Sequence, residues 1–215
     1  MPATTKPTTT PTSTPKSKTA PKAAAKRADA QRNIVAILEA ATECLTLDPA
    51  ASTSEIAKAA GVGRVTLYGH FPSRAELIDA VFVHAIEGGE GALGQVDLTG
   101  DPRDALARLI ESSWHLVDRY SSLLIAAQDS LPPGRVRELH ADPMARVERL
   151  LERGRKEGVF RTDLPTSWLV SAMHNVMHGA AGEIHGGRLT PDNAAGYITL
   201  TLIAAFTPPG KPVPS

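Results

Sequence analysis

Apolar residues recur at helical spacing from Asp29 onwards, and this pattern predicts a chain built only from helices. In the first stretch the apolar positions follow one another at intervals of four, three and four residues, the period of a helix with one buried face. These positions are Ile34, Leu38, Ala41 and Leu45. Proline is poorly tolerated inside a helix, so we expect this helix to end before Asp48 and Pro49.

Two short helices joined by a tight turn are predicted next. Ser52 and Glu55 stand at the spacing of a capping box, in which each side chain bonds to the backbone of the other residue. A helix over 53–60 follows, and Gly61 provides the left-handed conformation that ends it. A second helix over 64–70 completes a helix-turn-helix, an arrangement whose second helix typically enters the major groove of DNA.

Another helix is predicted after Pro72, followed by a glycine-rich joint. Ser73 and Glu76 form a second capping-box pattern at its start. The inner face of this helix carries Leu77, Ile78, Val81 and Ala85, and glycines follow at positions 88, 89, 91 and 94. A phosphate-binding loop needs a preceding strand and a Gly-Lys-Ser/Thr ending, so we expect a flexible joint over 88–100, after a domain spanning 29–87.

A second helical block is predicted over 101–207. One apolar stripe precedes the break at Leu131-Pro132-Pro133-Gly134 and another follows it. The last two predicted helices, 165–183 and 191–206, are apolar on more than one face, so they need cover on several sides. We expect a second copy of the chain to supply this cover, and a disordered tail over 208–215. The fold class is therefore all-α, with two helical domains.

Composition adds a contrast between the N-terminus and the rest of the chain. Six of the 23 basic residues and none of the 23 acidic residues fall within residues 1–28, which leaves 17 basic against 23 acidic residues in the remainder. This Thr-, Pro-, Lys- and Ala-rich segment has little to bury, so we expect a disordered tail that either solubilises the protein or adds phosphate contacts to DNA. The single cysteine, Cys44, excludes an internal disulfide, and the polar N-terminus predicts a cytoplasmic protein outside the membrane.

The sequence contains none of the common catalytic motifs that we considered. The chain lacks a GxSxG elbow, an HExxH pair, a complete phosphate-binding loop and a CxxC pair. We therefore expect a protein that is not an enzyme and that needs no cofactor.

The segment STSEIAKAAGVGRVTLYGHFPSRAELIDAVF, residues 52–82, resembles the DNA-binding region of the TetR family of bacterial transcriptional regulators. The matching pieces are Ile56-Ala57, Ala60-Gly61-Val62, Thr66-Leu67-Tyr68 and His70-Phe71 with Arg74 and Leu77 after them. The resemblance covers residues 30–86, and beyond them only the number of helices and the turn GVFRTDLP agree with the family. It implies a regulator, by default a repressor, that leaves a near-palindromic operator when a small molecule binds.

Within this segment, Ile56, Val62 and Leu67 are expected to form the small apolar core, which leaves the other side of the second helix for DNA. The positions free to face DNA are Gly63, Arg64, Val65, Thr66, Tyr68, Gly69 and His70. Arg64 can donate two hydrogen bonds to guanine, and the methyl groups of Val65 and Thr66 can pack on thymine. By similarity to the family, Tyr68 and His70 bind phosphates, and Thr53 and Arg74 hold phosphates on either side. The alternative is a helical hairpin that only packs.

Two glycines of this segment depart from the family pattern. Position 69 is usually larger in the family, and Gly63 is similarly bare. A glycine inside a helix costs about 1 kcal/mol relative to alanine. We therefore expect a weak recognition helix that makes fewer direct base contacts than usual.

The resemblance also implies that the C-terminal domain binds a small molecule and pairs with its twin through the helices at 165–183 and 191–206. Apolar walls with a few polar groups suit a lipophilic organic ligand. The candidate lining residues are Trp114, His115, Tyr120, Met173, His174, Met177 and His178. For each of them, a place in the hydrophobic core is the alternative.

Other functions remain open at this point. His174, His178 and His185 lie at spacings of four and seven, so a metal-sensing regulator is one alternative, although Gly186 and Gly187 indicate that the helix ends there. A helical adaptor for protein partners is another alternative, but it leaves the Arg, Thr, Tyr and His cluster of residues 64–70 without a role.

Overall fold

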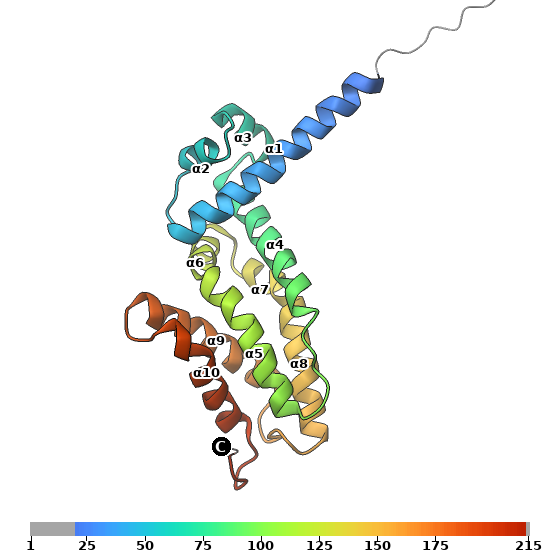
Figure 1. Cartoon of the computed structure of the whole chain (residues 1–215), viewed down its shortest axis with the longest axis vertical. Coiled ribbons are helices and arrows are strands. Elements are labelled where there is room, and N and C mark those ends of the chain that lie inside the picture. The colour runs from blue at the N-terminus through green and yellow to red at the C-terminus, as the bar shows by residue number, and fades with distance from the viewer. Residues whose placement is uncertain (1–19, 214–215) are drawn as a thin grey trace, which may run out of the picture.

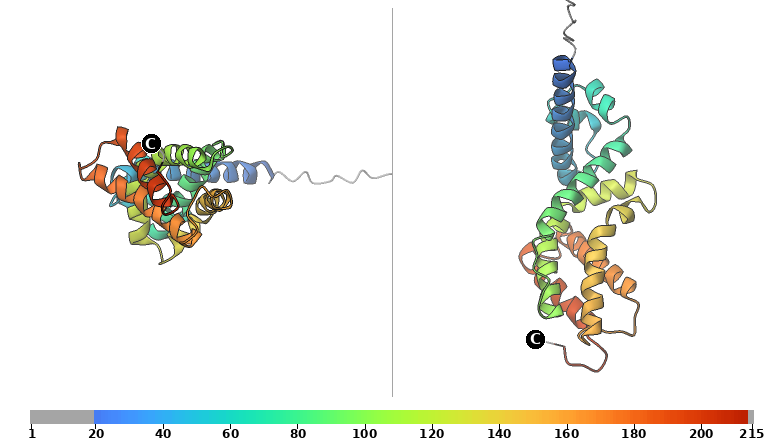
Figure 2. Two further views of the ribbon diagram at one scale, coloured as in Figure 1. Left: turned by 90° about the horizontal axis from the view of Figure 1, so that it is seen from below. Right: turned by 90° about the vertical axis from the view of Figure 1, so that its right-hand side faces the viewer.

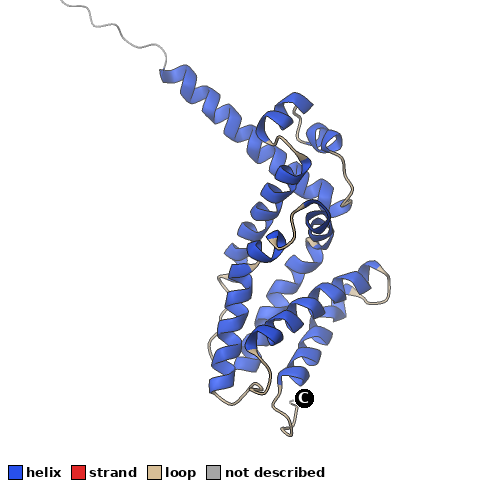
Figure 3. Cartoon of the chain, turned by 180° about the vertical axis from the view of Figure 1, so that it is seen from behind, coloured by secondary structure: helices blue, strands red, loops and turns tan. Residues whose placement is uncertain are grey.

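The structure is a computed structural model that describes residues 20–213. Within them the chain forms ten helices and no strand (Figure 3), which confirms the predicted all-α class. The helices are α1 (Ala20–Leu47), α2 (Thr53–Ala59), α3 (Arg64–His70), α4 (Arg74–Leu93), α5 (Pro102–Arg119), α6 (Ser121–Ser130), α7 (Arg135–Leu139), α8 (Ala141–Lys156), α9 (Thr166–His185) and α10 (Pro191–Phe206).

The helices are arranged along one long axis, with α1, α2 and α3 at one end (Figure 1). Helices α5, α8, α9 and α10 form the other end, where α5 packs against each of the other three. The side view shows α4 running from the first group down into the second (Figure 2). Helix α6 packs on both α1 and α4, so the two ends share a continuous helical connection.

Two hydrophobic cores hold these ends together. The first lies among α1–α4 and α6 and includes the fully buried side chains of Ile37, Ile56 and Ile78. The second lies among α5 and α8–α10, and Leu93 at the end of α4 joins it. Because α4 contributes side chains to both cores, it cannot shift at one end without disturbing the other.

The helix-turn-helix forms as its sequence predicts. Ser52 caps α2, its side chain accepts a hydrogen bond from the Glu55 amide, and the Glu55 carboxylate accepts one from the Ser52 amide at 2.8 Å. Gly61 has φ of +66°, the left-handed conformation that few residues other than glycine adopt. Helix α3 then begins at Arg64, with Gly63 as its cap.

Helix α1 begins earlier than the hydrophobic pattern predicts. Its first residue is Ala20, so residues 20–28, which we expected in a disordered tail, continue the helix. The stretch APKAAAKRA consists mostly of alanine, lysine and arginine, the strongest helix formers, and its proline falls in the first turn, where no intrahelical hydrogen bond is lost. The rest of the predicted tail, residues 1–19, lies outside the described residues.

The predicted glycine-rich joint is wrong in its first part. Helix α4 continues through Gly88, Gly89 and Gly91 to Leu93, whereas residues 94–100 lie outside a helix. Gly89 is buried, and an added Cβ would lie 3.1 Å from Cδ1 of Leu116 on α5. The close approach of α5 and the burial of Leu93 stabilise a helix that the glycines alone disfavour.

Candidate functional site

Helix α3 buries one side chain and presents the rest of its length to solvent. Leu67 is 1% exposed and belongs to the core of α1–α4 and α6, whereas Val65 is 88% exposed. Arg64, Tyr68 and Gly69 are exposed as well, and Thr66 and His70 are half-buried at its margins. Leu67 therefore anchors α3, while Arg64, Val65 and Tyr68 lie on its solvent-exposed side.

Tyr68 and Thr53 are brought together although they lie on different helices. The Thr53 Oγ1 and Tyr68 Oη atoms are 3.0 Å apart. The hydrogen bond from Thr53, and then the one from Arg64, lowers the pKa of Tyr68. These contacts group a hydroxyl, a phenol and a guanidinium at the exposed junction of α2 and α3, where they can donate hydrogen bonds to phosphate oxygens.

Arg74, which is expected to bind a phosphate, makes contacts inside the protein that the sequence does not predict. Its guanidinium donates hydrogen bonds to the carbonyl oxygens of Ala51 and, at 3.0 Å, of Pro49. These carbonyls belong to the loop between α1 and α2, so they do not accept the hydrogen bonds that a helix would provide. Arg74 therefore ties this loop to the start of α4 through two of its guanidinium nitrogens.

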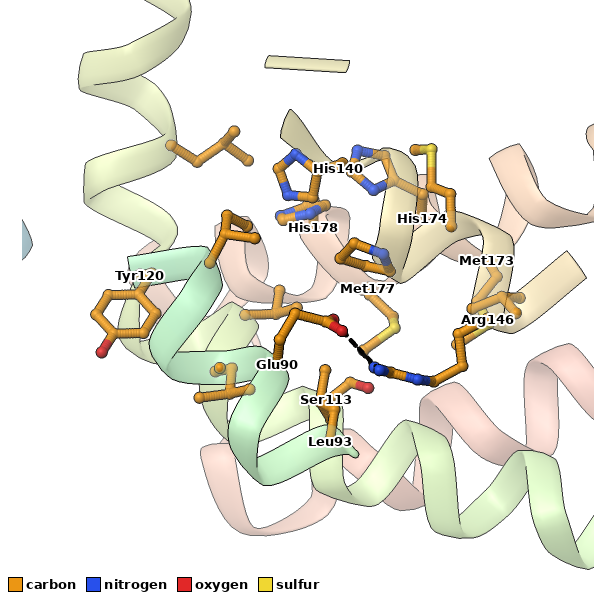
Figure 4. Close-up of a pocket in the computed structure, with 18 of the residues that line it drawn as sticks. Glu90, Leu93, Ser113, Tyr120, His140, Arg146, Met173, His174, Met177 and His178 are labelled. Atoms are coloured by element: carbon orange, nitrogen blue, oxygen red, sulfur yellow. Dashed lines mark hydrogen bonds and ion pairs between the residues drawn. The ribbon is translucent and has the colours of Figure 1, made fainter. Parts of the chain in front are cut away.

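The second feature is a cavity of about 150 Å³ between α4, α5, α6, α8 and α9 (Figure 4). Half of the 22 residues that line it are Leu, Val, Ile or Met. Five of the predicted ligand-binding residues line it, namely Tyr120, Met173, His174, Met177 and His178.

The other two predicted ligand-binding residues lie elsewhere. Trp114 is 3% exposed inside the core of the C-terminal helices, and His115 is exposed to solvent. The positions of α5 that face the cavity include Ser113, Leu116 and Val117. Successive residues of a helix are turned by about 100° from one another, so Trp114 and His115 point away from the face that these neighbours occupy.

His140, which the sequence does not single out, joins His174 and His178 at one end of the cavity. Its ring centroid lies 5.4 Å from that of His174 and 6.2 Å from that of His178, while His174 and His178 are 4.3 Å apart. His140 lies in the short turn between α7 and α8, far along the chain from α9. No periodic pattern connects these positions, so only the tertiary structure reveals this group, which we call the histidine cluster.

Burial keeps the histidine cluster uncharged. Burial, followed by the charges of His140 and Arg137, lowers the pKa of His174 to about 4. Burial, followed by the charges of the other two histidines, lowers the pKa of His178 to about 3. The pKa of His140 is also lowered by burial. At neutral pH all three imidazoles are therefore neutral.

Glu90 and Arg146 form an ion pair in the cavity wall, which sequence reasoning also missed. Arg146 on α8 donates hydrogen bonds of 2.6 and 3.0 Å to the two carboxylate oxygens of Glu90 on α4 (Figure 4). The Arg146 side chain is 17% exposed and the Glu90 side chain is 27% exposed, so water screens the pair only in part. This bidentate pair connects α4 directly to the helices of the C-terminal core.

The predicted alternative of a metal site formed by His174, His178 and His185 has no counterpart in the structure. Seven residues place His185 about 10 Å along the helix axis from His178. Its Nδ1 lies 2.9 Å from the Ala181 carbonyl oxygen. Across residues 20–213, no group of three or more His, Cys, Asp or Glu side chains is arranged to hold a metal ion.

Comparison with known proteins agrees with this architecture. Residues 37–81 match the family described as bacterial regulatory proteins, tetR family. Over 87 residues the chain is 39% identical to the transcriptional repressor LfrR of Mycolicibacterium smegmatis, a match that covers 40% of this chain and 46% of LfrR. It is 27% identical over 171 residues to the transcriptional regulator NfxB of Pseudomonas aeruginosa, covering 76% of this chain and 88% of NfxB.

A solved structure extends the likeness to both ends of the molecule. The crystal structure of LfrR from Mycobacterium smegmatis in complex with proflavine superimposes with a TM-score of 0.62 at 26% identity, covering 80% of this chain and 95% of LfrR. A helix-turn-helix with an exposed second helix, joined by α4 to a helical domain with a cavity, defines a DNA-binding transcriptional regulator. The family match and these relatives confirm the resemblance to TetR-family regulators stated from residues 52–82, and the matched residues 37–81 include the whole helix-turn-helix.

No helix within residues 20–213 is long and apolar enough to cross a membrane. The related proteins named above are regulators and repressors of transcription.

Proposed function

We propose that this protein is a repressor that binds a near-palindromic operator as a dimer and leaves it when a mostly apolar organic molecule fills the cavity. The observation that carries the proposal is the outward face of α3, where Arg64, Val65 and Tyr68 are exposed while Leu67 anchors the helix. Arg64 reads guanine and Val65 packs on thymine, whereas Tyr68 and Thr53 hold a phosphate.

The dimer is proposed to form through α9 and α10, close to the predicted ranges 165–183 and 191–206. Large apolar side chains are exposed on these two helices, with Trp168 at 61%, Tyr197 at 55% and Leu200 at 59%. A second copy related by a two-fold axis covers this surface and places two α3 helices on successive turns of one face of the DNA. The symmetry of the dimer then requires a near-palindromic operator.

The dimer surface can be tested by Leu200→Glu, which places a charge where the two copies meet. We expect this variant to be a monomer by light scattering and to bind the operator much more weakly. Leu47→Glu is the matched control, because Leu47 is 87% exposed at the end of α1 and far from α10 in the chain. A dimeric Leu200→Glu variant would place the interface elsewhere.

Release by a ligand follows from the path of α4. The helix begins next to α3, and its other end contributes Gly89, Glu90 and Leu93 to the cavity wall. A molecule that enlarges the cavity therefore moves α4 and changes the separation of the two α3 helices of the dimer. To change a bound to free ratio of 99:1 into 1:99, the ligand must favour the released state by about 5.5 kcal/mol. The LfrR complex with proflavine supports an organic ligand in a related chain.

A gel shift with the purified protein and the DNA upstream of its own coding sequence tests the proposal. We expect binding that prefers a near-palindromic site and weakens steeply as salt is added, because phosphate contacts release counterions. Binding without sequence preference, or none at any salt concentration, contradicts the proposal. A later screen for compounds that release the DNA then identifies the ligand.

A further inference from the structure

The cavity has one anionic and one permanently cationic side chain, and these two bind each other. Among the cavity-lining residues that the structure describes, Glu90 is the only acid and Arg146 the only arginine or lysine. Both carboxylate oxygens of Glu90 accept hydrogen bonds from the Arg146 guanidinium. A ligand cation that takes Glu90 leaves Arg146 partly buried without its partner, which is unfavourable.

The histidine cluster has hydrogen-bonding capacity that is still open, as have the hydroxyl groups of Ser113 and Tyr120 elsewhere in the cavity wall. His140 Nδ1 lies 2.9 Å from the Val136 carbonyl oxygen, and a carbonyl can only accept, so Nδ1 carries the proton and the neutral ring leaves Nε2 as an acceptor. The rings of His174 and His178 have no hydrogen-bond partner among residues 20–213. Figure 4 shows the three rings gathered at one side of the cavity, away from the Glu90–Arg146 pair.

Among the uncharged side chains that line the cavity, only the imidazoles of this cluster are bases, so the charge of the cluster can change only from neutral to positive. The charged and titratable groups that act on it are its own three rings and Arg137, and each of these is neutral or positive. The two charged side chains in the rest of the cavity lining, Glu90 and Arg146, form an ion pair with each other. An approaching anion therefore meets groups that can gain a proton, while an approaching cation meets no free carboxylate among the lining residues.

We infer that the effector is an organic acid whose apolar body lies against Met173, Met177 and the leucines of the cavity and whose anionic head lies against His140, His174 and His178. This inference rests on the proposed function, because it names the chemical class of the ligand that occupies the same cavity. The head accepts hydrogen bonds from imidazole N–H groups, and the Glu90–Arg146 pair stays intact beside it.

Binding of the anion is accompanied by uptake of a proton from solvent. The ligand enters as a carboxylate, a neutral imidazole of the cluster takes up a proton, and the resulting imidazolium donates to the carboxylate. The nearby negative charge raises the pKa of that imidazole above its value in the empty cavity. Because the complex holds more protons than the free protein between these two pKa values, affinity rises as the pH falls, by at most ~tenfold per pH unit.

Three probes test the inference. They have the same eight-carbon alkyl group and differ in the polar group at its end, namely octanoate, octan-1-ol and octylammonium. Titration calorimetry on the full chain in buffers of different ionisation enthalpy measures both the affinity and the number of protons exchanged. We expect octanoate to bind most tightly, to take up as much as one proton per ligand, and to bind more tightly at about pH 6 than at about pH 8. Tighter binding of octylammonium, or octanoate binding without proton uptake, overturns the inference.

Two variants test whether the histidine cluster, and not a histidine elsewhere, is responsible for the preference and the proton uptake. In the double variant His174→Gln and His178→Gln we expect the preference for octanoate over octan-1-ol to fall by at least ~tenfold and proton uptake to be lost. His84→Gln is the matched control, because His84 is an exposed histidine of α4 that does not line the cavity, and it should keep both properties. An unchanged preference in the double variant overturns the inference.

Operator binding, measured in parallel on the same preparations, tells the two proposals apart. If the protein binds DNA specifically and prefers octylammonium or binds none of the three probes, the regulator stands and the organic acid is wrong. If octanoate binds with proton uptake but the protein has no operator, the ligand class stands and the proposed repressor fails.

Discussion

The helix-turn-helix and the cavity hold their functional side chains in different ways. In the helix-turn-helix the candidate residues fall within 53–70, on two adjacent short helices, and most of them are exposed. The cavity collects its lining from Phe82 to His178, on helices that are far apart along the chain. The helix-turn-helix depends on contacts between residues that are close in the chain. The cavity forms only when the helices of the C-terminal end have packed together. Changes in sequence should therefore act differently at the two ends.

The largest effect is expected where a single side chain supports the exposed helix. Leu67 is the one buried side chain of α3, and a buried leucine replaced by alanine destabilises a protein by about 2–5 kcal/mol. Leu67→Ala should lower the free energy of unfolding in urea by this amount and abolish operator binding. Val65→Ala, on the same helix at an 88% exposed position, should change the free energy of unfolding by less than about 0.5 kcal/mol. Equal losses for the two variants would show that α3 is not held by Leu67.

Gly154→Ala tests the tight packing of the C-terminal end. An added Cβ on α8 would overlap Cδ2 of Phe160 and lie 2.6 Å from its Cε2 and 3.0 Å from Cβ of Pro102. Overpacking of this kind typically costs about 1–3 kcal/mol, which should appear as a lower midpoint of thermal unfolding. At Gly88, an added Cβ meets nothing within 4 Å, so Gly88→Ala should instead stabilise α4 by up to about 1 kcal/mol. A stable Gly154→Ala protein would mean that Phe160 can move aside.

Within the helix-turn-helix, base reading and phosphate binding can be separated. Arg64→Ala should reduce the discrimination between the operator and its single-base variants by about 1–3 kcal/mol at one base pair of each half-site. Tyr68→Phe removes only a hydroxyl group and should weaken binding to all sequences alike. Fluorescence anisotropy with a set of labelled operators measures both effects. Loss of discrimination in Tyr68→Phe would reverse the assigned roles.

The smallest effect is expected at Gly69. An added Cβ meets nothing within 4 Å there, and alanine is favoured over glycine in a helix by about 1 kcal/mol. Gly69→Ala should therefore stabilise α3 and slow the exchange of its amide hydrogens. Gly61→Ala is the contrasting control, because Gly61 has φ of +66°, which is strained for alanine and should destabilise the turn. Faster exchange in Gly69→Ala would contradict the view that this glycine weakens the helix.

Local sequence signals are sufficient for much of the molecule. The Ser52 and Glu55 capping box, the turn at Gly61 and the helix over 64–70 were predicted with nearly the observed bounds, because each depends on contacts between near neighbours in the chain. The wrong predictions about helix bounds concern parts of helices that lie away from such signals. Residues 20–28 lack an apolar stripe, and the glycines of α4 give a breaker signal that packing against α5 overrides.

The cavity shows the limit of the same reasoning. Met173, His174, Met177 and His178 were expected to line a site for a lipophilic ligand, and all four line the cavity. Trp114 and His115 were expected beside them and lie elsewhere, because helical spacing does not say which face of α5 meets α9. Arg74 was assigned to phosphate by similarity to the family, and its hydrogen bonds to the loop carbonyls of Pro49 and Ala51 have no signal in the sequence.

The sequence by itself determined the helical class, the helix-turn-helix and the side chains that α3 presents, because caps, turns and one buried anchor act over a few residues. Only the tertiary structure decided that His140 meets His174 and His178, that Glu90 pairs with Arg146, and that α4 belongs to both cores. These contacts join residues that are distant in the chain, and their charge states follow from shared burial, which no local pattern encodes.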